Sequence, residues 1–323
     1  MDPLSDLLRV VRLDGAFFYA VEAAEPWSIE SAPARELTPR ILPSSEHLIS
    51  YHIVMDGRCY GGLLGEPPVE LVAGDVIVFP HGDPHVMCSE PGLRAGPDVR
   101  TSAPDRYPNT VVLGEEPGLR KVSFVCGYLG CDRRPFNPLL EALPHRMHMR
   151  GMSSGWIGTF TRQVAGESAP GGAGSDLVLT RMAELMFIEV LRRYLDELPQ
   201  GQTGWLAGLR DDVVGRALAL LHERPGHAWT LEELAGAAIS SRSNLARRFT
   251  DLVGQPPMQY LTQWRMQVAA NQLSRSSAKV ATIGAGVGYD SEAAFSRAFK
   301  KATGVAPGAW REARRPPRPQ YPP

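Results

Sequence analysis

Long apolar runs are missing from this 323-residue chain. Nowhere do about 18 apolar residues follow one another, the length that a membrane span requires. The chain begins Met-Asp-Pro-Leu-Ser-Asp, without the basic residues that open a signal peptide. From these absences we expect a cytoplasmic location and no membrane partner.

Cysteine is scarce as well. The four cysteines are Cys59, Cys88, Cys126 and Cys131, all in the first half and none in a C-x-x-C pair. Structural disulfides are rare in cytosolic proteins. We therefore expect small, buried apolar side chains, with a reactive thiol as the alternative.

Net charge is almost absent, at −1, but its distribution is uneven. Residues 205–323 hold 16 Lys and Arg against 9 Asp and Glu, or +7, which leaves −8 for residues 1–204. A basic C-terminal third suits a polyanionic partner. A solvated basic face would give the same asymmetry, so other signals are needed.

An internal repeat supplies such a signal. Residues 234–249 match residues 284–299 at an offset of 50. Each copy predicts a short helix, a tight turn and a second helix with arginine outside, which is the pattern of a helix-turn-helix. The offset pairs Ala235 with Ala285, Gly236 with Gly286, Ser241 with Ser291, Arg247 with Arg297 and Phe249 with Phe299.

The second helix of each copy is expected to enter the major groove, and we call these two the reading helices. The first is predicted from Arg242 to about Val253, closed by Gly254, and the second is capped by Ser291. Arginine can fork onto guanine and asparagine onto adenine. Arg247 and Arg297 share one repeat position and are the candidates for base contact, with solvated surface arginines as the alternative. The predicted DNA contacts are Arg242, Ser243, Asn244, Arg247, Arg248, Glu292, Ser296, Arg297, Lys300 and Lys301; of these, Arg248, Lys300 and Lys301, together with Arg275, are assigned to phosphates.

The N-terminal part contains many short strand-like segments, which favour an all-β barrel or sandwich. The segments are 17–23, 48–55, 58–63, 69–71, 75–79, 85–89 and 122–129, with a long loop predicted over 90–117. A long helix is predicted from Ser175 to about Leu198. Its apolar residues cover more than one face, which favours burial against both the barrel and a second subunit. Burial within one subunit is the alternative.

One segment of the β region carries a more specific pattern. In residues 74–85, Gly74 is followed by five residues and then by Pro80-x-Gly82-x-x-His85, which resembles the second signature of the cupin barrel. His52 lies where the first signature often supplies a ligand, but its usual histidine and glutamate partners are missing. Two or three imidazoles from His52, His81 and His85 could still hold a metal ion. The alternative is a turn kept for barrel geometry.

The C-terminal motifs resemble the AraC/XylS family of bacterial transcription regulators. The resemblance rests on Trp229–Ala235, Ser241–Phe249 and Gly286–Trp310, about a third of the chain. It implies a homodimer that binds double-stranded DNA and acts on RNA polymerase, with a cupin-type sensor. The family's base-contacting positions map onto Ser243, Ala246, Arg247, Glu292, Ala293 and Arg297, and neither alanine can hydrogen-bond a base.

The Pro80-His-Gly82 turn and Val125-Cys126-Gly127 also resemble a subgroup that includes a reactive-chlorine-sensing regulator. This resemblance makes Cys126, with Cys88 and Cys59, candidates for oxidant sensing, provided that a positive neighbour lowers the thiol pKa. A small ligand in the barrel is the other candidate signal. We assign no cofactor beyond the metal ion considered above.

The predicted fold class is α+β: a cupin-like β-barrel with trailing helices, then an all-α domain with two helix-turn-helix units. The predicted ranges are 1–135 for the sensor barrel, 136–204 for a helical dimerisation and linker region, 205–315 for the DNA-binding domain and 316–323 for a disordered tail. The predicted function is a sequence-specific transcription regulator that responds to a signal sensed by the barrel, and not an enzyme. We expect an activator, with a repressor as the alternative. The alternatives are a metal-dependent cupin enzyme fused to a DNA-binding module and a scaffold with degenerate repeats.

Overall fold

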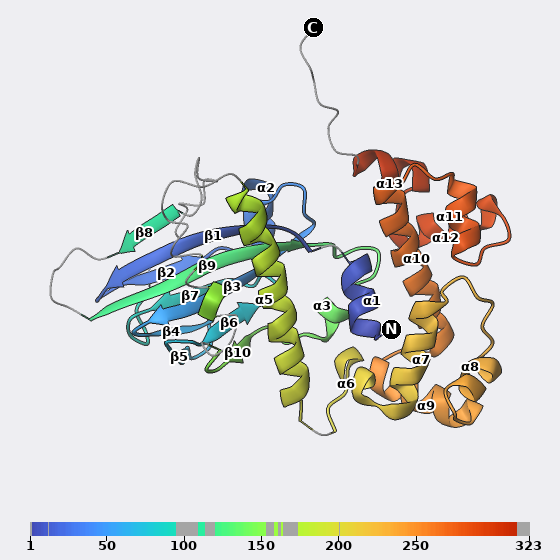
Figure 1. Cartoon of the computed structure of the whole chain (residues 1–323), viewed down its shortest axis with the longest axis horizontal. Helices are drawn as coiled ribbons and strands as arrows, with labels where there is room; N and C mark the ends of the chain where they lie inside the picture. Colours follow the sequence, from blue (N-terminus) through green and yellow to red (C-terminus); the bar gives the residue numbers. More distant parts are fainter. Residues whose placement is uncertain are drawn as a thin grey trace, which may run out of the picture. The chain divides into compact units, whose positions relative to one another are not determined.

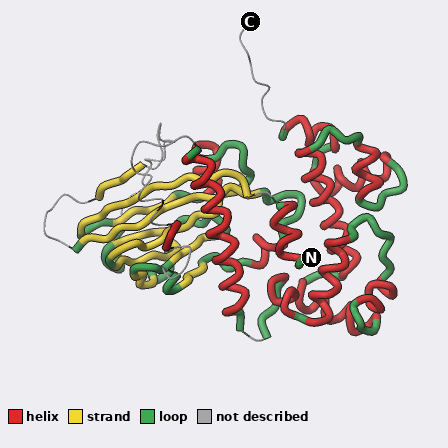
Figure 2. The backbone as a smooth tube through the Cα atoms, viewed as in Figure 1, coloured by secondary structure: helices red, strands yellow, loops and turns green. Residues whose placement is uncertain are grey.

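A computed structural model describes residues 2–11, 13–94, 109–113, 120–152, 158–160, 163, 174–199 and 201–314. By its internal contacts the chain forms two compact units (Figures 1 and 2). The helical unit comprises Met1–Arg12, Arg133–Ala142 and Leu198–Pro323, and the sheet unit comprises Leu13–Asp132 and Leu143–Glu197. The predicted ranges run consecutively along the chain, whereas each unit combines separate segments. The predicted tail lies outside the described residues.

The sheet unit is built of two sheets, as expected for a cupin. The larger has the order β10-β6-β3-β9-β1-β8 and the smaller β2-β7-β4-β5. Trp27, Phe79 and Phe124 belong to the core cluster of this unit. The strands are β1 (Leu13–Ala24), β2 (Ser28–Ser31), β3 (His47–Asp56), β4 (Arg58–Leu63), β5 (Val69–Val72), β6 (Val76–Phe79), β7 (His85–Cys88), β8 (Asn109–Leu113), β9 (Lys121–Cys131) and β10 (Met147–Met149).

Each predicted strand is present, but the loop predicted over 90–117 is wrong at β8. Asn109–Leu113 pairs in parallel with β1. Its β-branched sequence is typical of a strand. The flanking Pro and Gly residues led to the prediction of a loop instead. The short strand β10 and the helix α2 (Ala34–Ile41) were not anticipated. The helix α5 (Ser175–Glu197) confirms the predicted long helix.

The helical unit contains both repeats. Its C-terminal helices are α6 (Trp205–Arg210), α7 (Asp212–Glu223), α8 (Leu231–Ala237), α9 (Arg242–Val253), α10 (Pro257–Arg275), α11 (Val280–Gly286), α12 (Glu292–Thr303) and α13 (Pro307–Ala313). Helix α10 connects the first repeat (α8, α9) to the second (α11, α12), as Figure 1 shows. Within the described residues, no helix combines the length and apolarity needed to cross a membrane.

The predicted caps Gly254 of α9 and Ser291 of α12 are confirmed, and α9 has an N-cap, Ser241, that was not predicted. Ser241 accepts a hydrogen bond from Asn244 N, and Ser291 accepts one from Ala294 N. Gly254 ends α9 in the left-handed conformation, with φ of 82°, because glycine adopts it without a Cβ clash. The sequence signals at both helix ends are therefore sufficient to place these helices.

The predicted alignment of the first helices of the repeats is wrong by one residue. Helix α8 starts at Leu231 and α11 at Val280, an offset of 49, while α9 and α12 start 50 apart. Leu234 therefore corresponds to Ile283, and both are buried. The extra residue of the second repeat lies in its turn, so Ala235 and Gly236 do not match Ala285 and Gly286.

The turns of the repeats differ in strain. Ile239 has a φ of 57°, the only positive value at a non-glycine among the described residues, and its side chain is 77% exposed. Gly288, the equivalent residue by the 49-residue offset, has a φ of 84°. A β-branched residue rarely adopts this conformation. The left-handed backbone conformation therefore strains Ile239 in the first turn, whereas Gly288 adopts it without strain in the second.

The N-terminal helix α1 (Pro3–Val10) is part of the helical unit. Leu7 is fully buried, and α1 contacts α7 and α10. The side chain of Asn271 on α10 donates a hydrogen bond to the carbonyl of Val10 at 2.8 Å. The segment 133–142, with α3 (Pro138–Ala142), joins the same unit, since Phe136 N donates to Gln267 Oε1 at 3.1 Å. Neither segment was assigned to this unit from the sequence.

Candidate DNA-reading face and sensor site

The two reading helices expose equivalent faces. Phe249 and Phe299 are fully buried, as are Leu245 and Phe295 one turn earlier. These apolar residues fix the opposite side of each helix outward. Among the predicted contacts, Asn244 and Ser296 are half-buried, while Arg242, Ser243, Arg247, Arg248, Glu292, Arg297, Lys300 and Lys301 are exposed.

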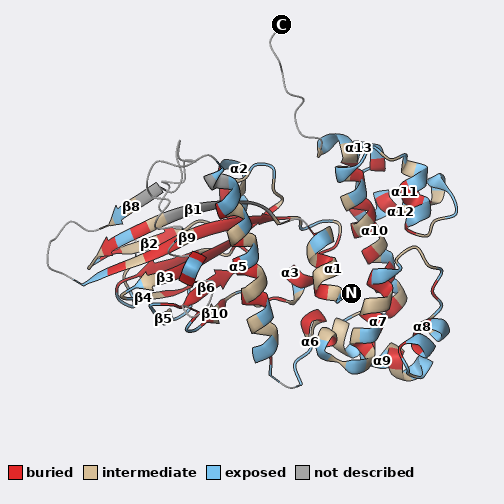
Figure 3. Cartoon of the chain, in the orientation of Figure 1, coloured by how far each residue is buried: buried red, intermediate tan, exposed pale blue. Residues whose placement is uncertain are grey.

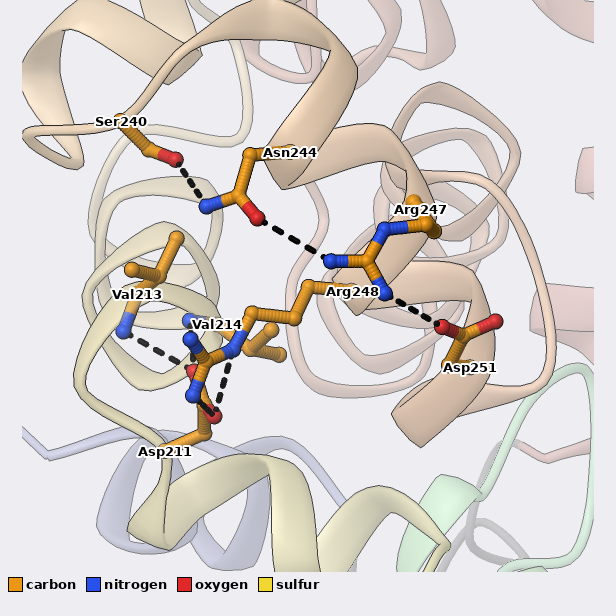
Figure 4. A network of polar contacts seen from close by, with 8 residues as sticks. All are labelled: Asp211, Val213, Val214, Ser240, Asn244, Arg247, Arg248 and Asp251. Atoms are coloured by element: carbon orange, nitrogen blue, oxygen red, sulfur yellow. Dashed lines mark hydrogen bonds and ion pairs between the residues drawn. The ribbon is translucent and has the colours of Figure 1, made fainter.

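Arg247 lies in a row of polar contacts along α9 (Figure 4). Asn244 Nδ2 donates to Ser240 Oγ at 2.9 Å, and Arg247 Nη2 donates to Asn244 Oδ1 at 3.4 Å. Arg247 Nη1 lies 3.5 Å from Asp251 Oδ2. The arginine and aspartate side chains are 69% and 61% exposed, so solvent weakens this ion pair and leaves Arg247 free to exchange it for a base.

Arg248 is held differently from the other predicted phosphate contacts. Its Nε and Nη2 donate to Asp211 Oδ2 at 3.0 and 2.5 Å. Asp211 also accepts hydrogen bonds from Val213 N and Val214 N, and so caps α7 (Figure 4). Burial raises the pKa of Asp211, but its hydrogen bonds from Val214, Arg248 and Val213 outweigh burial and lower it. Arg248 therefore ties α9 to α7, and a phosphate would have to compete with a carboxylate.

The second reading helix is more cationic. Lys301 occupies the position that Asp251 holds in α9, at the offset of 50. Arg297, Lys300 and Lys301 form no ion pair or side-chain hydrogen bond with any other residue that the structure describes, so their charges face solvent. The acidic Glu292 stands where α9 has Arg242.

In the sheet unit, the predicted sensing cysteine Cys126 meets two of the predicted metal ligands, His52 and His85. His52 Nδ1 lies 2.8 Å from Cys126 Sγ, and His52 Nε2 lies 2.9 Å from His85 Nε2. His85 Nδ1 lies 2.8 Å from the carbonyl of Asp83, which can only accept, so this nitrogen carries the proton. In neutral rings His52 Nε2 then donates to His85, and the Cys126 thiol donates to His52.

Burial favours that neutral state. It lowers the pKa of His52 well below its usual value, and the nearby His85 adds to the shift. Burial also lowers the pKa of His85 to about 4, despite the carbonyl of Asp83. The pKa of the Cys126 thiol is raised by burial and by Cys59. The resting site is therefore a protonated thiol and two neutral imidazoles.

Within the part of the chain that the structure describes, no positive neighbour of the kind that an oxidant-reactive thiolate requires acts on these cysteines. Cys59 and Cys88 are buried. Burial raises the pKa of Cys59 to about 12 and also raises the pKa of Cys88. A sensing cysteine here would react as a thiol or after rearrangement.

The three histidines considered as metal ligands are not brought together. His81 Nε2 lies 2.9 Å from the carbonyl of Leu143, and its ring faces His145, with centroids 4.6 Å apart. The facing nitrogens of His52 and His85 bond to each other. Among the described residues, no group of three or more His, Cys, Asp or Glu is placed to hold a metal ion. The donors therefore do not fit a cupin metal centre.

The buried histidines make the sheet unit sensitive to acid. Both have folded pKa values below the unfolded value of about 6.5, so the unfolded chain binds protons first as the pH falls. Stability should be greatest above pH 6.5 and decline toward pH 4, by up to about 1.4 kcal/mol per pH unit for each histidine. Urea unfolding across this range measures the slope. His52→Gln should reduce the slope by up to the contribution of one histidine. An unchanged slope would contradict the assignment of the acid sensitivity to His52.

Comparisons with known proteins agree with this architecture. Residues 2–196 match the cupin family model, and residues 234–313 match a helix-turn-helix domain. A Streptomyces antibioticus protein named as an AraC-like transcription regulator is 32% identical over 97% of this chain and 99% of its own length. A Streptomyces lividans protein of the same description is 32% identical over 97% and 98%. The RCS-specific transcriptional activator RclR of Escherichia coli is 30% identical over 58% of this chain and 67% of its own.

Proposed function

The chain belongs to the AraC-like transcription regulators with an N-terminal cupin domain, and on that basis we propose that α9 and α12 read two successive major grooves. The observation that carries this proposal is the repeated exposure of Arg247 and Arg297 opposite fully buried phenylalanines. An arginine so placed can fork onto a guanine. Equivalent placement in both repeats favours base contact over a solvated role.

We infer different tasks for the two helices. Helix α9 combines Arg242, Asn244 and Arg247, which can recognise bases, with the acidic Asp251 that weakens attraction to any DNA. Helix α12 combines Arg297 with Lys300 and Lys301, which suit phosphates regardless of sequence. The first repeat is therefore proposed to supply more base discrimination and the second more general affinity. Arg248 contributes through α7 rather than through phosphate.

We propose a homodimer that pairs through α5. Leu179, Phe187 and Val190 are buried within the unit, while Leu177, Val178 and Leu185 are 63%, 48% and 55% exposed. Figure 3 shows buried and exposed residues along this helix. Covering the exposed apolar residues with the same helix of a second copy would remove them from water.

We further propose that the protein acts in the cytoplasm as an activator that works with RNA polymerase.

The relatives of this chain are named as transcription regulators and not as enzymes. We therefore propose that the barrel receives a signal. Two classes of signal fit. The neutral, unreactive thiol of Cys126 favours a small ligand as the signal. The contact between Cys126 and His52, and the similarity to an RCS-specific activator, favour an oxidant.

A gel shift on the DNA upstream of the gene tests this proposal. The full chain is run reduced, treated with hypochlorite, and as Cys126→Ser under both conditions. If oxidation is the signal, hypochlorite should change the shift of the wild type and not that of Cys126→Ser. Identical shifts in all lanes would discard oxidation and leave a ligand. No sequence-dependent shift in any lane would discard the regulator itself.

A further inference from the structure

Arg265 on α10 joins the turn that precedes the first repeat to the turn of the second repeat. Its Nε donates to the carbonyl of Pro225 at 2.7 Å, and its Nη2 donates to the carbonyl of His227 at 2.8 Å. Both carbonyls belong to the turn between α7 and α8, which precedes the first repeat. The planar fork of arginine suits two acceptors at once, which a lysine ammonium cannot match in geometry.

The same guanidinium lies against the second repeat. A Cβ atom on Gly288, in the turn between α11 and α12, would stand 2.8 Å from Arg265 Nη2 and 2.7 Å from the carbonyl of Gly226. A Cβ on Gly226 would stand 2.5 Å from the carbonyl of Gly286. The two turns therefore touch backbone to backbone, at a distance that excludes even a methyl group.

This junction is distinct from the DNA-reading face. Burial lowers the pKa of Arg265, although the nearby Tyr289 opposes the shift, so the guanidinium is partly withdrawn from water. Its hydrogen bonds go to carbonyls, and it lies in neither reading helix. Because α8 packs on α9 and α11 on α12, joining the turn before α8 to the turn after α11 limits how far the reading helices can move apart or rotate.

We propose that Arg265, with Gly226 and Gly288, fixes the relative placement of the two reading helices and so selects the spacing between the two DNA boxes. Arg265 is a positioning residue, and the inference rests on the proposed function. One added base pair rotates the second box by about 35° and moves it by about 3.4 Å. A rigid pair of readers cannot follow that change, whereas a loosened pair can. Loosening also lowers the effective concentration of the second reader once the first is bound.

The test uses the full chain and a two-box duplex that the wild type selects from a randomised pool. Fluorescence anisotropy compares this duplex with versions carrying one added or one deleted base pair, and with a duplex in which one box is scrambled. Arg265→Lys removes the double hydrogen bond, and Gly226→Ala forces the turns apart from the other side. Gly236→Ala is the matched control, since a Cβ there meets nothing within 4 Å.

The wild type and Gly236→Ala should lose about 10-fold in affinity for each one-base-pair change in spacing. Arg265→Lys and Gly226→Ala should lose about 10-fold on the original duplex, keep their single-box affinity within about twofold, and show a spacing penalty of about 3-fold or less. A wild-type spacing penalty in both variants would overturn the proposal. So would a common loss on every duplex, which is also what misfolding would produce. If the wild type selects no sequence at all, the proposed function fails instead.

Discussion

Replacing Leu7 by alanine is expected to destabilise the helical unit by about 2–5 kcal/mol, the usual cost of truncating a buried leucine. Leu7 has no exposed surface, and its helix contacts α7 and α10, more than 200 residues away in the chain. The substitution leaves a cavity between elements that support both repeats. Protection of the α7 and α10 amides from hydrogen exchange should fall by a factor that corresponds to this loss.

Leu8→Ala is the matched control, because Leu8 is only half-buried in the same helix. It should cost clearly less. The amides of β1 and β9 should keep their protection in both variants. Loss of protection in those strands, with α7 and α10 unchanged, would show that α1 stabilises the sheet unit and would contradict its assignment.

Arg247→Ala and Arg297→Ala should each weaken binding to a selected site by about 1–3 kcal/mol, or about 5- to 150-fold. Each removes a fork that can reach both acceptors of a guanine. Affinity for single-base variants of the site should show that preference is lost at one position for each substitution. We expect Arg247→Ala to cost more in base preference, because α9 is the less cationic reader.

Arg58→Ala controls for loss of a positive charge, since Arg58 is an exposed arginine on β4 that pairs with Glu70. It should bind like the wild type. A uniform loss across all sequences in Arg297→Ala would reassign that residue to a phosphate. Unchanged binding in both variants would remove the reading helices from the proposal.

Local patterns were sufficient to predict the reading helices. Ser241, Gly254 and Ser291 mark helix ends by hydrogen bonds within a few residues, and the buried Phe249 and Phe299 follow helical spacing. The sequence could not assign α1 to the helical unit. The apolar residues of α1 show that it packs against another element, but they do not show which one. That partner is chosen by packing over a separation that no local pattern spans.

The site residues divide in the same way. The spacing of Arg247 and Asp251 could have indicated their pairing, since residues four apart meet on a helix. The pairing of Arg248 with Asp211, 37 residues away, could not have been found. No local motif links His52 to Cys126. The two residues meet because they are paired in the register of β3 and β9. His81 lies in a turn, where strand alternation gives no direction, and it was wrongly grouped with His52 and His85.

The pairing of Leu13 with Cys131, at one end of β1 and β9, has a practical consequence. The chain leaves the sheet unit just beyond each of these residues, and it passes between the two units at 12/13, 132/133, 142/143 and 197/198. A protease that nicks the segment between α5 and α6 severs one passage of four, and leaves α1 seated on α7 and α10. The nicked halves should therefore copurify. A graft of this barrel onto a foreign reader, joined only at residue 198, would strand α1 without its partner, so α1 and residues 133–142 have to be exchanged together with the C-terminal helices.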